Sequence, residues 1–242
     1  MRRISARTKI IALIAVALNV CAIVALWQIS RSRTFQFFGE VIPRVNTSQK
    51  VVALTFDDGP TIQGTDQILA ILAEQNIKAT FFVIGAELER NLDPGRKIVA
   101  AGHELGNHTY SHVRMMLVTP SFVKQEIEST DRLIRDAGYE GEILFRPPYG
   151  KKLLALPYYL SKNGRKSITW DVEPESYPEI DANADKIAEH VLANTRPGSI
   201  IILHVMYPNR RESMNAVKKI IEGLKAQGYT FKTISELLAA GA

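Results

Sequence analysis

The stretch VVALTFDDGP, residues 51–60, decides the fold of this chain. Its first six residues are apolar or β-branched and Gly59-Pro60 bounds them, which predicts a short buried strand. Asp57 and Asp58 follow where that strand ends. Asp-Gly-Pro is also ordinary turn chemistry. An unpaired buried carboxylate is costly, however, so two adjacent ones on so apolar a strand favour a functional site.

Strand-like and helical patterns alternate along the rest of the chain. The other predicted strands are 80–84, 104–107, 143–145, 167–170, 199–203 and 230–233. Helical repeats lie between them, such as residues 119–137, which Thr119 opens and Gly138 closes. About seven strands that alternate with helices predict an α/β fold with parallel strands and helices outside. Polar motifs at the ends of different strands favour a closed or nearly closed barrel over an open sheet.

The N-terminal region predicts a membrane anchor. Residues 10–29 carry no charge and are long enough to span a bilayer as a helix, and Trp27 lies near the far end. Four basic residues precede this run and two follow it, which predicts a cytoplasmic segment 1–9. The rest of the chain would then lie on the periplasmic or extracellular side of the cytoplasmic membrane. Secretion after cleavage of a signal peptide is the alternative.

The remaining chain divides into a predicted linker, 30–49, and a folded domain, 50–242. Phe35, Phe37 and Phe38 make the linker too apolar for a solvated tether, so it either docks on the domain or lies in the membrane interface. The sequence leaves both open.

Charge and cysteine content exclude some functions. Residues 1–33 hold six of the 30 Lys and Arg and no acid, so the remainder carries 24 basic and 25 acidic residues. That balance leaves no basic stripe for nucleic acid, and none is expected as a partner. Cys21 is the one cysteine of the sequence, so an intrachain disulfide is impossible.

Two histidines follow the third predicted strand. His108 and His112 are four residues apart, which on one helical turn puts both imidazoles on the same face. Metal-binding pairs use this arrangement, and an aspartate from another strand end would complete a three-ligand catalytic site. His103 lies in the same stretch, and we interpret it as structural.

Four motifs together carry a resemblance. TFDDGP at 55–60, HTYSH at 108–112, RPPYG at 146–150 and LH at 203–204 occur in this order at predicted strand ends. Over roughly residues 50–235 the chain resembles the polysaccharide deacetylases, the NodB-homology family of carbohydrate esterases. The resemblance implies a distorted (β/α) barrel and metal-dependent removal of N- or O-acetyl groups from polymeric sugars.

The resemblance also implies roles for single residues. Asp58, His108 and His112 would bind a divalent metal, with Zn²⁺ as the expected ion. Asp57 would be the general base that takes a proton from water. His204 would be the general acid that protonates the departing amine.

Two further residues would support this chemistry. Arg146 would hold Asp57 ionised and oriented through a bidentate contact. The backbone N–H of Tyr149 would complete an oxyanion hole with the metal. Arg146 could instead be a structural ion pair, and Tyr149 a simple wall of the site.

One motif departs from the family pattern, which usually has Asp-x-x-Asp-Trp where its first Asp orients the acid histidine. Alignment on Trp170 puts Glu173 in that place, with Asp171 as the alternative. Tyr177 takes the place of the usual Trp. Tyr149, Trp170 and Tyr177 are the predicted sugar-contacting residues, and the change to Tyr177 leaves the substrate preference open.

The predicted substrate is a polysaccharide that contains N-acetylglucosamine, with peptidoglycan as first choice and chitin-type oligosaccharides second. Another N-acyl or O-acetyl sugar, such as a lipid-linked saccharide or xylan, is one alternative. A non-catalytic wall-binding protein is another. A glycosidase is excluded because side chains of adjacent strand residues point apart and cannot flank a glycosidic bond.

Overall fold

The stretch that begins at Val51 forms the central strand β2 (Val51–Asp57) in the computed structural model, which describes residues 5–241. All seven residues of β2 are buried. It lies between β3 (Thr80–Val83) and β6 (Ile200–His204), and β4 (Glu104–Asn107) lies beyond β3. These ladders are parallel, as predicted. The sheet therefore gathers its carboxyl ends, where the charged motifs follow, at one edge.

The other strands are short. β7 (Thr230–Phe231) pairs with the start of β2, and β1 (Val41–Ile42) pairs with β5 (Ser167–Ile168) in a separate two-stranded sheet. The predicted strand 143–145 is absent from the described residues and survives as isolated bridges at Phe145. Pro147 and Pro148 follow after Arg146, and because proline lacks an N–H they cannot continue a ladder. The predicted seven-stranded ladder thus becomes a five-stranded and a two-stranded sheet.

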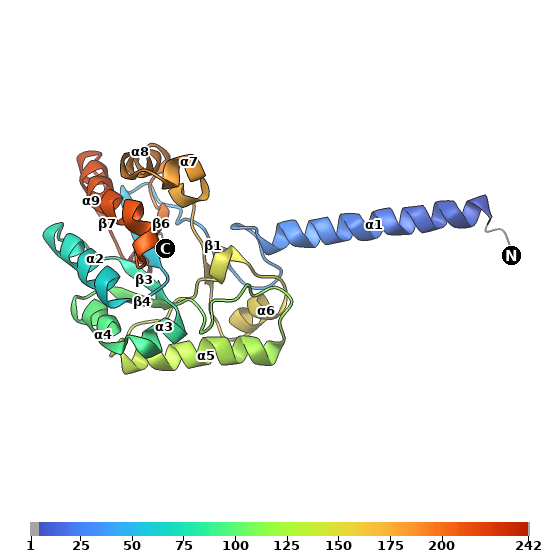
Figure 1. Cartoon of the computed structure of the whole chain (residues 1–242), viewed down its shortest axis with the longest axis horizontal. Helices are drawn as coiled ribbons and strands as arrows, with labels where there is room; N and C mark the ends of the chain where they lie inside the picture. Colours follow the sequence, from blue (N-terminus) through green and yellow to red (C-terminus); the bar gives the residue numbers. More distant parts are fainter. Residues whose placement is uncertain (1–4, 242) are drawn as a thin grey trace.

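Helices surround the sheets (Figure 1). The helices of the domain are α2 (Ile62–Glu74), α3 (Gly85–Arg90), α4 (Leu92–Ala100), α5 (Pro120–Asp136), α6 (Ala155–Lys162), α7 (Pro178–Asp181), α8 (Ala184–Asn194), α9 (Arg211–Ala226) and α10 (Ile234–Ala239). α5 confirms the predicted signals, because the Thr119 side chain accepts a hydrogen bond from the backbone N–H of Phe122 and Pro120 starts the first turn. Short 3₁₀ turns occur at Pro148–Gly150, Pro174–Ser176 and Pro208–Arg210.

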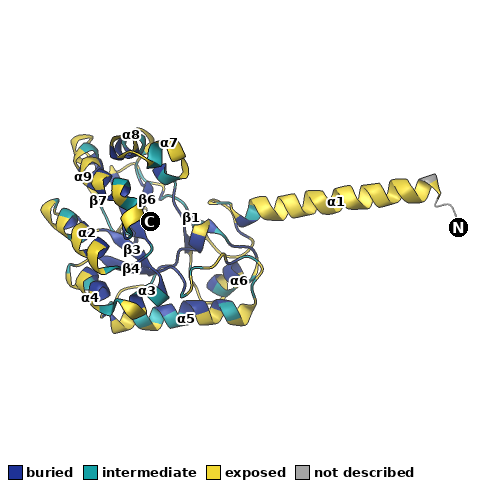
Figure 2. Cartoon of the chain, viewed as in Figure 1, coloured by how far each residue is buried: buried dark blue, intermediate teal, exposed yellow. Residues whose placement is uncertain are grey.

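Helix α1 (Ala6–Ser30) projects from the domain and is exposed along nearly its whole length (Figure 2). Its residues Arg7–Ser30 are long and apolar enough to cross a membrane, by length and composition. A signal sequence would meet the same criterion.

The segment predicted as a linker is part of the folded domain. Besides forming β1, it contributes Val45, which is buried and whose N–H donates to the carbonyl of Gly198 at 2.9 Å. Residues before position 50 therefore pack with the predicted domain 50–242. The sequence pattern gave little sign of a strand here, because β1 is only two residues long and is defined by its pairing with β5.

Candidate active site

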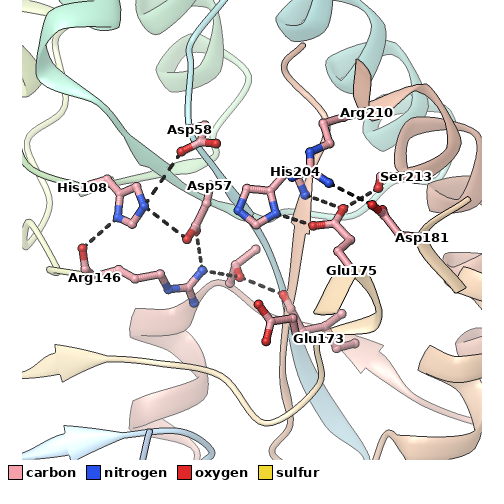
Figure 3. Close-up of polar contacts among 12 residues, drawn as sticks. Asp57, Asp58, His108, Arg146, Glu173, Glu175, Asp181, His204, Arg210 and Ser213 are labelled. Carbon is pink, nitrogen blue, oxygen red and sulfur yellow. Dashed lines mark hydrogen bonds and ion pairs between the residues drawn. The ribbon is translucent and has the colours of Figure 1, made fainter. Parts of the chain in front are cut away.

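The register of the sheet brings the predicted acid and base together. Asp57 ends β2 and His204 ends β6, and the two are direct partners in the parallel ladder. His108 follows β4, two strands away from β2 on the other side. Three strands thus deliver their polar ends to one site (Figure 3).

Asp58, His108 and His112 form a possible metal site. Each offers a ligand atom, and these atoms lie within 4.8 Å of one another. The closest contact is 3.2 Å, between His112 Nε2 and Asp58 Oδ1. His108 Nδ1 lies 2.8 Å from the carbonyl oxygen of Arg146, which can only accept, so this nitrogen carries the hydrogen. The lone pair of Nε2 is then free for a metal.

The loop that carries the two histidines is not the helical turn that their spacing suggested. Thr109 and His112 have φ values of 65° and 56°, in the left-handed region that an α-helix excludes. Neighbours hold this strained backbone. Asn107 Oδ1 accepts from the N–H of Thr109 at 2.8 Å, and the Glu126 carboxylate of α5 accepts from the N–H and hydroxyl of Ser111. The rings of His108 and His112 nevertheless meet, with centroids 4.9 Å apart.

The donor set fits a divalent cation. Among the described residues, no hydrogen-bond donor reaches the buried Oδ1 of Asp58, although unsatisfied buried carboxylate oxygens are costly. Burial, together with the charge of His108, lowers the pKa of His112 to about 4, so its imidazole is neutral at neutral pH. Two imidazoles and one carboxylate are ligands that Zn²⁺ accepts, with a position left for water.

Asp57 pairs with a fully buried arginine. Arg146 Nη1 donates to Asp57 Oδ1 at 2.5 Å and to the Thr55 hydroxyl at 2.8 Å, and Nη2 donates to the Thr169 carbonyl. The contact with Asp57 uses one nitrogen, so the predicted bidentate geometry is wrong. Burial would raise the pKa of Asp57, but the charge and hydrogen bond of Arg146, together with His108 and His204, outweigh it, and the pKa lies below its usual value. Asp57 is therefore ionised at neutral pH.

His204 contacts Glu175, a residue that the sequence analysis did not select. The Glu175 carboxylate accepts hydrogen bonds from ring Nδ1, from the His204 backbone N–H and from the Ser213 hydroxyl, and the carboxylate is nearly buried. Burial opposes a charged imidazole, but this carboxylate raises the pKa of His204 to about 9. Figure 3 shows the His204 ring between Glu175 and the Asp57 side of the site.

Glu173 and Asp171, the two residues that the sequence suggested for orienting His204, have other partners. Glu173 contacts Arg33 at 3.4 Å and lies away from the His204 ring in Figure 3. Asp171 accepts from the hydroxyl of Ser199 and the N–H of Ile200, at the start of β6. The 3₁₀ turn Pro174–Ser176 causes the difference, because it places Glu175, within the turn, against β6. The sequence did carry a signal for this contact, because Glu175 is an acidic residue two positions after the aligned Glu173.

The predicted sugar-contacting residues differ in exposure. The Tyr149 ring is half-exposed and packs against the His112 ring with centroids 4.7 Å apart, at the site. Trp170 is buried beneath Arg146, whose Cζ lies 5.6 Å from the ring centroid, so it cannot be an open wall of a cleft. Tyr177 is exposed and its ring packs on His190 of α8.

His103 is structural, as interpreted from the sequence. It is buried, and its Nδ1 accepts from the N–H of Ala79 at 3.2 Å.

Known proteins share this sequence and this fold. Residues 44–168 match the family model described as polysaccharide deacetylase. A peptidoglycan-N-acetylglucosamine deacetylase of Bacillus cereus is 32% identical over 200 residues, covering 83% of this chain and 93% of the relative. A chitooligosaccharide deacetylase of Sinorhizobium fredii is 34% identical over 208 residues, covering 81% and 95%.

Solved structures agree. One neighbour is BA3943 of Bacillus anthracis, described as a CE4 family pseudoenzyme, with a TM-score of 0.74 and 28% identity. The match covers 82% of this chain and 69% of the BA3943 chain. Because a pseudoenzyme shares the fold, the site residues must carry any statement about chemistry. The chain is an enzyme of the polysaccharide deacetylase family.

Proposed function

We propose that this protein is a metal-dependent hydrolase that removes N-acetyl groups from a polysaccharide containing N-acetylglucosamine. The observation that carries the proposal is one site that holds both a candidate metal triad and an acid–base pair with opposed pKa shifts. The domain would have the distorted (β/α) barrel of its family. Helix α1 would anchor it in the cytoplasmic membrane, with the site on the periplasmic or extracellular side.

The acid and the base are assigned by their surroundings. Arg146 lowers the pKa of Asp57, so Asp57 is free to accept a proton at neutral pH. Glu175 raises the pKa of His204 to about 9, so His204 carries a proton to donate. Two neighbouring titratable groups whose pKa values are pushed apart are the pattern of an acid–base pair.

Asp58, His108 and His112 would hold the divalent ion, with Zn²⁺ as our first choice. When bound, such an ion polarises a carbonyl and lowers the pKa of water. Asp57 would accept a proton from the attacking water as the acetyl carbon is attacked. His204 would then protonate the nitrogen of the leaving amine, which is otherwise a poor leaving group. The Tyr149 N–H would donate to the developing oxyanion.

Peptidoglycan is our first choice of substrate and chitin-type oligosaccharides are the second. Relatives named for each of these substrates support a polymer that contains N-acetylglucosamine. The test is acetate release by the purified full-length chain in detergent on peptidoglycan, chitin oligomers and acetylated xylan, before and after chelation and with Zn²⁺ restored. We expect release from the N-acetylglucosamine polymers that chelation abolishes and Zn²⁺ restores.

Other outcomes would select the alternatives. Release from xylan alone would indicate an O-acetyl esterase. Release from a lipid-linked saccharide but from no polymer would indicate a deacylase of membrane precursors. Binding to peptidoglycan without acetate release, at full metal content, would indicate a non-catalytic wall-binding protein.

A further inference from the structure

We propose that the face of the domain from which α1 emerges rests on the membrane and contacts anionic lipid headgroups. This face, here called the juxtamembrane surface, consists of residues 31–40 and 151–166. The inference rests on the proposed membrane anchor and goes beyond it, because it makes the folded domain itself a membrane-binding surface.

The juxtamembrane surface exposes an unusual group of apolar side chains. Phe35, Phe37 and Phe38 are 50%, 39% and 41% exposed, and Leu154 and Tyr158 are about half-exposed. Four of their rings meet in two pairs, Phe38 with Tyr158 edge to face at 5.5 Å and Phe35 with Phe37 at 5.9 Å. Single exposed apolar residues need no explanation, but several on one short loop and the adjoining segment mark a binding surface.

The loop that carries the three phenylalanines is held in place by its own hydrogen bonds. The buried side-chain amide of Gln36 donates to the carbonyls of Phe38 and Glu40, at 2.8 and 3.0 Å. Gly39 has φ +67° and packs so closely on α6 that a Cβ there would lie 3.1 Å from Cβ of Ser161. The loop is therefore held against α6 with its phenylalanines outward, and folding has not buried them.

The charge of this surface matches an anionic membrane. Residues 31–40 and 151–166 contain seven basic side chains and one acidic side chain. Lys152 is buried, and Arg33, Arg165 and Lys166 form ion pairs with Glu173, Asp131 and Glu40. Arg31, Lys151 and Lys162 have no ion pair among the described residues, which leaves the surface net positive. Lys151 Nζ lies 4.2 Å from the centroid of the Trp27 ring, and Lys162 Nζ lies 5.7 Å from that of Tyr158. Aromatic rings beside lysine and arginine are the composition of interfacial membrane surfaces.

The attachment of α1 identifies the bilayer, and not a protein, as the occupant. Ser30, the last residue of α1, is buried, and its carbonyl accepts from the N–H of Lys152 at 3.0 Å. The buried amine of Lys152 donates to the Ser32 carbonyl at 2.6 Å. No free tether therefore separates the helix from the domain, and α1 leaves the domain beside α6 (Figure 1). A bilayer crossed by α1 must begin at the juxtamembrane surface.

The same segment reaches the active site. Lys151, which contacts Trp27 of α1, is two residues after Tyr149, whose ring packs on His112. The metal site would therefore lie close to the lipid headgroups. Saccharides at the membrane surface would be within its reach, and distant layers of a wall would not.

Nitroxide probes in the full chain test the proposal. With Cys21→Ala as background, a single cysteine replaces Phe37, Leu154 or, as a matched control, Ala226, an exposed residue at the end of α9. Each labelled protein is reconstituted in vesicles of phosphatidylglycerol and phosphatidylcholine. Collision with oxygen, which concentrates in lipid, is compared with collision with a water-soluble nickel chelate. We expect a higher oxygen-to-nickel ratio at positions 37 and 154 than at 226.

The outcomes separate this proposal from the anchor itself. Equal ratios at all three positions, in protein that stays with the vesicles after an alkaline wash, would overturn the lipid contact and leave the anchor. Protein lost in the wash would overturn the anchor, and the lipid contact with it. Probes at 37 and 154 that are water-accessible in vesicles yet shielded in native membranes would show a protein partner and refute the lipid assignment. Acetate release measured on the same samples reports the proposed function independently.

Discussion

At the scale of single residues, Asp57 and Asp58 are adjacent in the chain and share His108, whose Nε2 lies 3.5 Å from Asp57 Oδ2 and 4.0 Å from Asp58 Oδ1. Their other partners differ, because Asp57 pairs with Arg146 and Asp58 with His112. We expect Asp58→Asn to lose bound metal, because a neutral amide oxygen replaces an anionic ligand. We expect Asp57→Asn to keep the metal and to lose about 10²–10⁴-fold in kcat, the usual contribution of a placed base. Metal content measured beside kcat distinguishes the two roles.

The buried Arg146 adds a consequence for stability. Removing one partner of a buried ion pair typically costs about 3–5 kcal/mol, so Asp57→Asn should also melt at a lower temperature. His204→Ala is the matched control, since it should keep both the metal and the Arg146–Asp57 pair. An Asp57→Asn protein that is folded but empty of metal, beside an inactive Asp58→Asn protein that is fully loaded, would reverse the assignments.

Glu175 governs the pH dependence of the acid. His204 must be protonated to donate, and its pKa of about 9 means that activity falls as pH rises through that value. Glu175→Gln removes the negative charge that raises this pKa. The alkaline limb of the kcat profile should then move down toward the ordinary pKa of about 6.5, a shift on the order of two pH units.

Ser213→Ala provides the matched control for Glu175→Gln. Ser213 donates to the same carboxylate but carries no charge, so its loss should move the alkaline limb much less. An alkaline limb that stays in place in Glu175→Gln would mean that another group controls it.

At the scale of elements, sequence patterns predicted the strands better than the loops. β2, β4 and α5 lie close to their predicted bounds, because apolar periodicity and caps are local signals. The loop at 108–112 was assigned helical spacing, yet its geometry depends on contacts with Asn107 and Glu126, which are not local.

Glu175 was missed for a related reason. Alignment on Trp170 counts residues, but the turn at Pro174–Ser176 changes which of them faces β6. The predicted metal ligands and His204 meet at one site because their motifs fix them directly at strand ends. Trp170 was misjudged because burial beneath Arg146 depends on packing that the sequence does not display.

The segment after α1 should contribute to the stability of the domain. A chain of residues 29–242 keeps the carbonyls of Ser30 and Ser32 that Lys152 needs, whereas residues 34–242 lack them. Each of the two buried Lys152 donors left unpaired costs about 1–3 kcal/mol, so at about 2–4 °C per kcal/mol the shorter chain should melt roughly 4–24 °C lower. Lys152→Met keeps the apolar stem but removes the amine. Made in both chains, this substitution should reduce the difference between their melting temperatures. Equal melting temperatures for the two unmutated chains would refute this role.

At the scale of the whole molecule, the arrangement of α1 and the domain predicts where the enzyme resides. α1 is exposed along nearly all of its length and apolar enough to span a bilayer, while its last residue is buried in the domain. We expect the full-length protein to stay in the membrane fraction after an alkaline wash. Protease added from the periplasmic or extracellular side should degrade the domain.

A chain with Leu18→Arg and Ala22→Arg is the matched control for this placement. Each arginine at the centre of a helix opposes insertion by about 2.5–3.5 kcal/mol, so this variant should leave the membrane fraction. The mass of the mature protein completes the test, because an anchor keeps residues 1–29 and a signal peptide does not. A mature N-terminus beyond Trp27 would show cleavage and secretion. It would also separate Lys151 from the Trp27 ring on which it packs, so that the domain would have to hold Ser30 and Ser32 without the helix before them.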